Sequence, residues 1–365
     1  MVTINDITSY LESIAPRQLQ EDYDNSGLLT GDASWNVSGV LLSLDCTEQV
    51  VEEAIQQGCN LIIAHHPIIF KGLKKLSTSH YAGRAVIMAI KHDVAIYAIH
   101  TNLDNIAEGV SKRMAEKIGL KNLHVLSPAK ETLMKLVTFV PAGSAKQVLD
   151  ELHKAGAGQI GNYKNCSFQS TGTGTFMPTG DSNPSIGQIN RQEHVEETRL
   201  ELIFPFYSEL AVMDALRKSH PYEEVAHYLT KLENENSEIG AGIVGDLENP
   251  LEPIEFLRRL KINMNTSCVR HTKTTDAKIK KVAVCGGSGS FLLSRAIAAG
   301  ADVFVTADFK YHEFFDADGK IIIADIGHYE SEQFTKDLIK DVLSKKFTTF
   351  AINFSKTITN PISYL

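Results

Sequence analysis

The sequence predicts an α/β domain that is interrupted in its middle by a smaller α+β domain. Apolar strands and amphipathic helices alternate over residues 1–130 and again over residues 240–365, which is the pattern of a largely parallel sheet covered by helices. Between them, residues 131–239 follow the order β-α-β-β-α-β, which is typical of a ferredoxin-like unit. A chain of 365 residues is long enough for two domains.

The first part of the outer domain begins with an amphipathic helix over residues 3–14, where Ile4, Ile7 and Leu11 share one face. A polar loop from Glu21 to Gly31 then leads into a short strand. The elements expected after it are, in order, strand 40–44, helix 47–57, strand 61–64, helix 81–92, strand 94–99 and helix 106–117.

The inserted domain and the second part of the outer domain follow. The expected inserted elements are strand 133–140, helix 145–155, strand 163–169, strand 199–204, helix 208–219 and strand 225–231. A Gly/Thr/Pro/Asn-rich stretch over 170–187 follows the strand at 163–169, and the polar tract 232–237 is expected to be the exit linker. The outer domain resumes with a helix starting at 255–259, strand 281–285, helix 291–299, strand 302–306, strand 321–325 and a closing edge strand within 347–354.

Composition narrows the class of protein. The net charge of -8 argues against a general nucleic-acid-binding surface. The five cysteines are odd in number and form no C-x-x-C pair, so neither a disulfide framework nor a cysteine zinc site is indicated. The N-terminus carries no signal-peptide pattern, and no apolar run is long enough for a membrane span. A reduced, cytoplasmic setting is therefore expected.

Histidines and carboxylates close three of the predicted strands. His65 and His66 follow the apolar run 61–64, and Pro67 supports the end of that strand. Ligands of open α/β sheets bind outside the carboxyl ends of the strands. Because neighbouring residues on an extended chain point to opposite sides, two adjacent imidazoles suit two different ions better than one.

The other two strand ends repeat this arrangement. Strand 94–99 is followed by His100 and Asp104, and strand 321–325 by His328 and Glu332. A helix entered after Gly327 would place His328 and Glu332 on one face, since they are four residues apart. Nitrogen and oxygen donors without cysteine suit zinc, iron, manganese or nickel.

Each of these residues also has an ordinary structural interpretation. A lone histidine at a strand end is more often bound to a backbone carbonyl, but three such clusters together favour a metal site. Asp45 either caps the helix at 47–57, with Glu48 completing a capping box, or orients a metal ligand. His100, one turn from Asp104, is either a group that supports a ligand or a general base.

Two glycine-rich runs need separate consideration. Gly240–Gly245 matches G-x-G-x-x-G, but it follows a polar segment and opens no helix, so nucleotide binding is not expected there. The run 286–290 does join a strand to a helix. Its backbone N–H groups could hold an anion, or the glycines could simply permit tight packing.

Five motifs together resemble those of the NIF-three-like dinuclear-metal proteins, often labelled GTP cyclohydrolase 1 type 2 homologues. They are Asp24–Leu28, Leu44–Thr47, Ala64–Pro67, His100–Asp104 and Gly327–Glu332. The inserted segment resembles the PII-like domain of longer bacterial members, through Asn183–Gly187 and His220–Val225.

The resemblance implies two interlocked α/β lobes, a toroidal homohexamer and two adjacent divalent ions per subunit, with zinc, iron or manganese as the candidates. It implies five ligands, namely His65, His66, Asp104, His328 and Glu332. Two functions are consistent with it. One is a metal-dependent hydrolase acting on a small molecule such as a nucleotide or heterocycle; the other is a non-enzymatic metal store, chaperone or regulator with the inserted domain as sensor.

Overall fold

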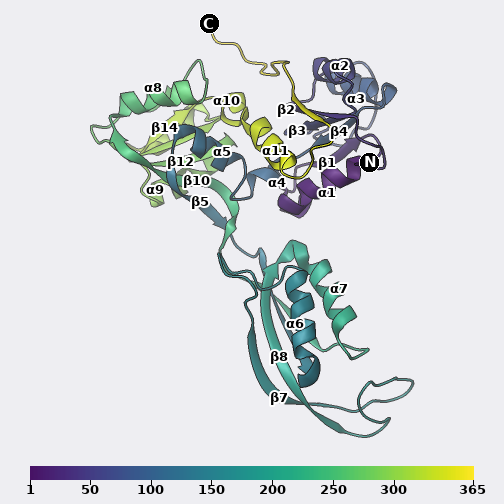
Figure 1. Ribbon diagram of the computed structural model, residues 1–365. Helices are drawn as coiled ribbons and strands as arrows, with labels where there is room; N and C mark the ends of the chain where they lie inside the picture. The colour runs from purple at the N-terminus through teal and green to yellow at the C-terminus, as the bar shows by residue number, and fades with distance from the viewer. The chain divides into compact units, whose positions relative to one another are not determined.

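The computed structural model describes residues 1–365 and contains two compact units (Figure 1). One unit is formed by Met1–Ser127 together with Glu238–Leu365, and the other by Pro128–Ser237. The boundaries expected from the sequence, after residue 130 and after residue 239, lie close to these positions. The two units are described separately below.

The first sheet of the discontinuous unit has the strand order β1-β4-β3-β2-β15. Its members are β1 (Gly27–Thr30), β2 (Gly39–Ser43), β3 (Leu61–Ala64), β4 (Ala95–Ala98) and β15 (Ala351–Phe354). β2, β3 and β4 are parallel and fully buried, and α2 (Glu48–Gln56) and α3 (Tyr81–Lys91) connect them. The predicted βαβ arrangement is thus confirmed. β15 pairs in parallel with β2 from far along the chain.

The second sheet of the same unit has the order β11-β14-β13-β12-β10-β5. Its members are β5 (Lys121–Ala129), β10 (Asn236–Leu251), β11 (Arg270–His271), β12 (Ile279–Ser288), β13 (Val303–Ala307) and β14 (Ile322–Asp325). β12, β13 and β14 are parallel, whereas β10 and β11 are antiparallel to their neighbours β12 and β14.

The helices of this unit are α1 (Ile4–Ile14), α4 (Thr101–Asp104), α5 (Val110–Ile118), α8 (Pro253–Asn263), α9 (Leu293–Ala298), α10 (His328–Glu332) and α11 (Thr335–Ser344), besides α2 and α3. Helix α5 comes from the N-terminal half, yet Met114 and Ile118 pack in one core with Val282 and Val303 of the second sheet. In the opposite exchange, β15 comes from the C-terminal half and pairs with β2 of the first sheet. The two halves of the chain therefore interlock. No helix is long and apolar enough to cross a membrane.

The unit Pro128–Ser237 is a four-stranded antiparallel sheet with the order β7-β8-β6-β9. Its strands are β6 (Leu133–Pro141), β7 (Phe168–Phe176), β8 (Glu193–Pro205) and β9 (His227–Leu232). Helices α6 (Ala145–Lys154) and α7 (Glu209–Ser219) pack against it, and Leu136, Val148, Leu202 and Val212 are among the residues of its own core.

Three expectations about secondary structure are wrong. The strand expected over 163–169 is instead β7, which begins at Phe168 and extends to Phe176, and β8 begins six residues before the predicted 199. The Thr/Gly sequence of β7 has no apolar period, because the strand is an exposed edge held by backbone pairing with β8. The expected linker 232–237 runs into β10, which contains the whole Gly240–Gly245 run. Ile243–Gly245 of that run pair with β12, and the run joins no strand to a helix, as expected from the sequence.

Candidate metal centre

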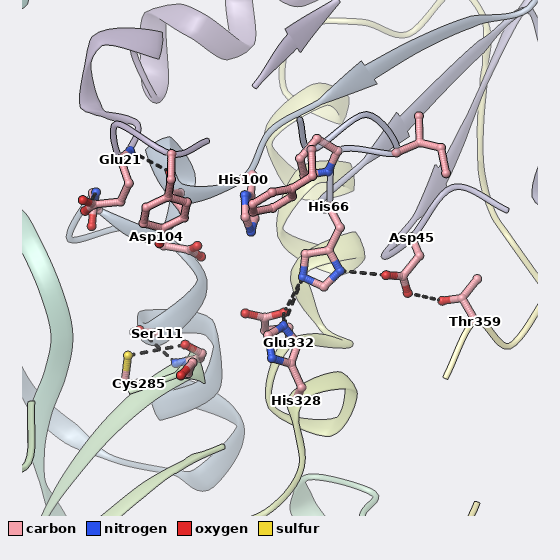
Figure 2. Close-up of a pocket in the computed structure, with 18 of the residues that line it drawn as sticks. Glu21, Asp45, His66, His100, Asp104, Ser111, Cys285, His328, Glu332 and Thr359 are labelled. Carbon is pink, nitrogen blue, oxygen red and sulfur yellow. Dashed lines mark hydrogen bonds and ion pairs between the residues drawn. The ribbon is translucent and has the colours of Figure 1, made fainter. Parts of the chain in front are cut away.

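Three strand ends bring histidines and carboxylates to one cavity of about 670 Å³ (Figure 2). His65 and His66 follow β3, His100 and Asp104 follow β4, and His328 and Glu332 lie on α10 just after β14. All five residues predicted as ligands are thus brought together, and the donor atoms of the whole set form overlapping groups that could hold a metal ion.

Glu332 lies at the centre of this arrangement and is almost fully buried. Its Oε1 is 3.8 Å from His65 Nε2. Its Oε2 is 2.9 Å from His66 Nε2 and 3.1 Å from His328 Nε2. The predicted helix after Gly327 is confirmed, and it does place His328 and Glu332 on one face. Each carboxylate oxygen faces a different set of donors.

The first set contains His65 and Asp104. The Nδ1 of His65 contacts the carbonyl of Ile99 at 2.8 Å. With a proton on Nδ1, this contact leaves Nε2 as a lone-pair donor. His65 Nε2 and Asp104 Oδ1 are 3.6 Å apart, and both are buried without a hydrogen-bond partner. Buried polar atoms without partners are costly, and a cation between them would satisfy both.

The second set contains His66 and His328, whose Nε2 atoms are 3.3 Å apart beside Glu332 Oε2. Asp45 binds His66 Nδ1 at 2.8 Å, and Asp308 binds His328 Nδ1 at 2.7 Å. A carboxylate on the far nitrogen fixes the ring and strengthens the near nitrogen as a ligand. Both imidazoles are therefore aimed at one point.

The helix-cap interpretation of Asp45 is wrong. The N-cap of α2 is Thr47, whose hydroxyl accepts from the N–H of Val50. Glu48 pairs with Arg84 instead of completing a capping box. Asp45 is thereby left to orient His66, the other role considered from the sequence.

Electrostatics favour positive charge in this pocket. Burial would lower the pKa of His66, but hydrogen bonds to Asp45 and Glu332 outweigh it and raise the pKa to about 10. Burial likewise opposes the charged form of His328, yet the charge of Glu332 and the bond to Asp308 raise its pKa to about 11. Burial and the neighbouring Glu332 raise the pKa of Asp104 to about 8. Two imidazolium rings this close repel each other, whereas a divalent ion satisfies Glu332 without that repulsion.

His100 is the residue that sequence reasoning placed outside the ligand set. Its Nδ1 lies 2.8 Å from Oδ1 of Asp24, a fully buried carboxylate that also accepts from the N–H and hydroxyl of Thr101. Burial would raise the pKa of Asp24, but the hydrogen bonds from His100 and Thr101 hold it below its usual range. The ligand atoms of His100, His65 and His66 lie within 4.8 Å of one another. His100 is therefore a further candidate donor beside the five predicted ligands. Its contact with Asp24 joins two sequence motifs that only the fold brings together.

His65 and His66 diverge less than expected for neighbours on a strand. Their ring centroids are 5.0 Å apart and their planes are inclined by 43°. β3 ends at Ala64, and the chain bends at these two residues. Both rings therefore turn toward Glu332, although each meets a different oxygen.

Comparison with known proteins shows which family the chain belongs to. Residues 2–361 match the family described as Duf34/NIF3 (NGG1p interacting factor 3). The chain belongs to this family. Relatives named GTP cyclohydrolase 1 type 2 homolog include one from Halalkalibacterium halodurans, 41% identical and covering 98% of each chain. Another, from Bacillus subtilis, is 39% identical and also covers 98% of each.

Solved structures of related proteins share the fold. A Bacillus cereus protein related to NIF3 superimposes with a TM-score of 0.86 at 38% identity, covering 100% of this chain and 99% of that one. A Staphylococcus aureus protein gives a TM-score of 0.79 at 31% identity with the same coverage. The mixed α/β architecture with several sheets is therefore that of Duf34/NIF3 proteins.

In this Duf34/NIF3 chain the glycine run 286–290 packs against the site. Gly287 donates its N–H to Ser331 Oγ at 2.9 Å. A Cβ atom at Gly287 would lie 2.4 Å from Glu332 Oε1. The structure thus supports close packing, the second of the two roles considered for this run.

Proposed function

We propose that this chain binds two divalent ions and acts as a metal-dependent hydrolase on a small molecule such as a nucleotide or heterocycle. The observation that carries the proposal is the position of Glu332. Its Oε1 faces His65 and Asp104, and its Oε2 faces His66 and His328. One buried carboxylate between two donor sets is suited to bridge two ions.

The donor side chains fall into two groups, one for each proposed ion position. The first position has His65, Asp104 and Glu332 Oε1, and a ring nitrogen of His100 lies within 4.8 Å of those of both His65 and His66. The second has His66, His328 and Glu332 Oε2. These mixed nitrogen and oxygen donors suit zinc, iron or manganese. Bound ions would supply Lewis acidity and lower the pKa of a coordinated water.

The aromatic residues of the cavity wall are suited to bind a planar substrate. Tyr23, Phe70, Tyr81 and Phe291 line it and are all substantially exposed. The rings of Tyr23 and Phe70 are stacked with centroids 6.2 Å apart, and Phe70 also meets His100 edge-on at 5.8 Å. Exposed aromatic faces next to polar donors suit an aromatic ring that carries the reacting group. The name of the curated relatives points to the same chemical class.

The test combines metal analysis with activity. Wild-type protein loaded with zinc, iron or manganese should contain two ions per chain and hydrolyse some member of a panel of nucleotides, phosphoesters and cyclic amides. Metal-free protein and Glu332→Gln should not. Glu255→Gln is the matched control, because Glu255 is an exposed carboxylate paired with Arg259 on α8. One ion at saturation would overturn the dinuclear centre, and two ions without turnover of any substrate would favour the second function.

The second candidate is a non-enzymatic metal-binding regulator, store or chaperone. It is favoured by the segment Pro128–Ser237, which has its own core and contributes no donor to the metal centre. In this proposal the segment is a PII-like sensor. A regulator of this kind should change its affinity for metal when a small molecule binds. This is measured by titrating the full chain with metal in the presence of each member of a metabolite library.

The assembly forms a separate part of the proposal. The resemblance implies a toroidal homohexamer, and closed symmetric assemblies are common among soluble proteins. Light scattering over a range of concentrations tests it. A monomer at every concentration would contradict it without affecting the metal centre.

A further inference from the structure

The C-terminal segment Ser355–Pro361, here called the strap, runs past the metal centre. It follows β15, and Phe354 of β15 lies in register with Leu42 of β2. The carboxyl ends of parallel strands meet at one edge of a sheet. The residues after β15 therefore emerge beside Asp45 and His66, which follow β2 and β3.

Helix α2 holds the start of the strap. Glu53 accepts from the hydroxyl of Ser355 at 2.6 Å, the N–H of Lys356 at 2.8 Å and the hydroxyl of Thr357 at 2.9 Å. None of these bonds involves a residue of the candidate metal centre. They fix where the chain enters the site.

The next two polar residues bond to the two segments that carry the second donor set. Thr359 donates its hydroxyl to Asp45 Oδ2 at 2.6 Å, and Asp45 Oδ1 lies 2.8 Å from His66 Nδ1 (Figure 2). Asn360 donates from Nδ2 to Glu330 Oε1 at 3.0 Å. Glu330 is buried on α10, between His328 and Glu332. The strap thus ties together the β2–α2 loop, which orients His66, and the helix that carries His328 and Glu332.

We propose that Thr359 is a positioning residue for the ion held by His66 and His328, and that the strap fixes this position through Asp45. The inference rests on the proposed dinuclear site. With Oδ2 held by Thr359, the Asp45 carboxylate cannot rotate freely, so Oδ1 stays on the Nδ1 of His66 and the ring keeps its direction. Thr359 itself offers no donor to the ion.

The test compares three single substitutions in the full chain. Thr359→Val removes the hydroxyl at nearly constant shape, and Thr359→Ser keeps it. Thr357→Val is the matched control, because it removes a strap hydroxyl that bonds to Glu53 rather than to Asp45. Each metal-free variant is titrated with zinc or manganese against a chelating indicator, and its unfolding temperature is recorded.

The expected result is selective. Thr359→Val should lower the affinity for one of the two ions by about 10-fold or more, which is the loss found when partners of metal-bound histidines are removed. The affinity for the other ion should not change. Thr359→Ser and Thr357→Val should keep the wild-type affinities. Because Thr359 acts through Asp45, Thr359→Val should add little on an Asp45→Asn background.

Different results separate this inference from the proposed function. Wild-type affinities in a folded Thr359→Val variant, or equal weakening of both ions, would overturn the inference. Full additivity with Asp45→Asn would also overturn it, since the two residues would then act independently. A wild-type chain that binds a single ion would overturn the dinuclear proposal. The role of Thr359 would then be decided by whether Thr359→Val weakens that ion.

Discussion

Gly287→Ala should damage the metal centre although residue 287 is no ligand. The new methyl group would lie 2.4 Å from Glu332 Oε1 and 3.4 Å from His328 Cε1. An ordinary contact begins at 3.4 Å, so Glu332 Oε1 must move by about 1 Å. Metal–ligand distances tolerate only about 0.2 Å. The carboxylate that faces both donor sets would therefore leave its position.

The substitution also strains the backbone, and a control separates the two effects. Gly287 has a φ of +62°, in the left-handed region, where an alanine costs about 1–2 kcal/mol. This cost alone predicts an unfolding temperature lower by about 2–8 °C. Gly300, after α9, has a φ of +71° and no atom within 4 Å of an added Cβ. Gly300→Ala should carry the same strain without touching the site.

Metal affinity is the deciding measurement. Affinity is measured by competition with a chelator. Gly287→Ala should bind ions at least about 10-fold more weakly than wild type, because moving a ligand should cost at least as much as removing a residue that supports one. Gly300→Ala should bind them normally, while both variants unfold at similarly reduced temperatures. If Gly287→Ala binds both ions with wild-type affinity, Glu332 is not held where the structure places it, and the bridging role fails.

Three further predictions concern stability and the inserted segment. Removing ions with a chelator should lower the unfolding temperature, because a free ion at about 1,000 times its Kd stabilises the fold by about 4 kcal/mol per site; equal melting curves would contradict a folded-state site. Burial would raise the pKa of Glu53, but hydrogen bonds from Lys356, Ser355 and Thr357 lower it below 4.5. The stability it contributes is therefore present above pH 4.5 and lost as the pH falls through the lowered value. Glu53→Gln should cost about 1 kcal/mol in urea unfolding at pH 7, and the difference from wild type should shrink toward pH 3; a constant difference would refute the charge argument. Joining Ser127 to Glu238 through a short Gly/Ser linker should leave a folded chain that binds two ions. Loss of both ions from a folded deletion variant would show that Pro128–Ser237 supplies a ligand.

The grouping of the candidate donors was predictable because these residues directly follow strands. His65 and His66 after Ala64, and Glu332 one turn from His328, need only the local pattern of an apolar strand and a short helix. The supporting groups were harder to foresee. Asp308 and Asp24 meet their histidines across 20 and 76 residues, and only the packed sheets bring those positions together.

The prediction of secondary structure failed where a strand is determined by backbone pairing rather than by its side-chain pattern. β7 is an exposed edge of Thr and Gly, and its length follows from its backbone pairing with β8. β10 begins in a segment whose composition favours a loop, yet the strand continues through Gly240 and pairs antiparallel with β12 from Ile243 onward. Local propensity carries no information about either partner.

The candidate donors are split between the two halves of the chain. His65, His66, His100 and Asp104 precede the inserted segment, whereas His328 and Glu332 follow it. Neither half holds both candidate donor sets, so these sets are complete only when the two lobes are packed together. The exchanges of α5 and β15 provide that packing. An insertion between β5 and β10 leaves every donor and both exchanged elements in place, which is why a whole folding unit can be accommodated there.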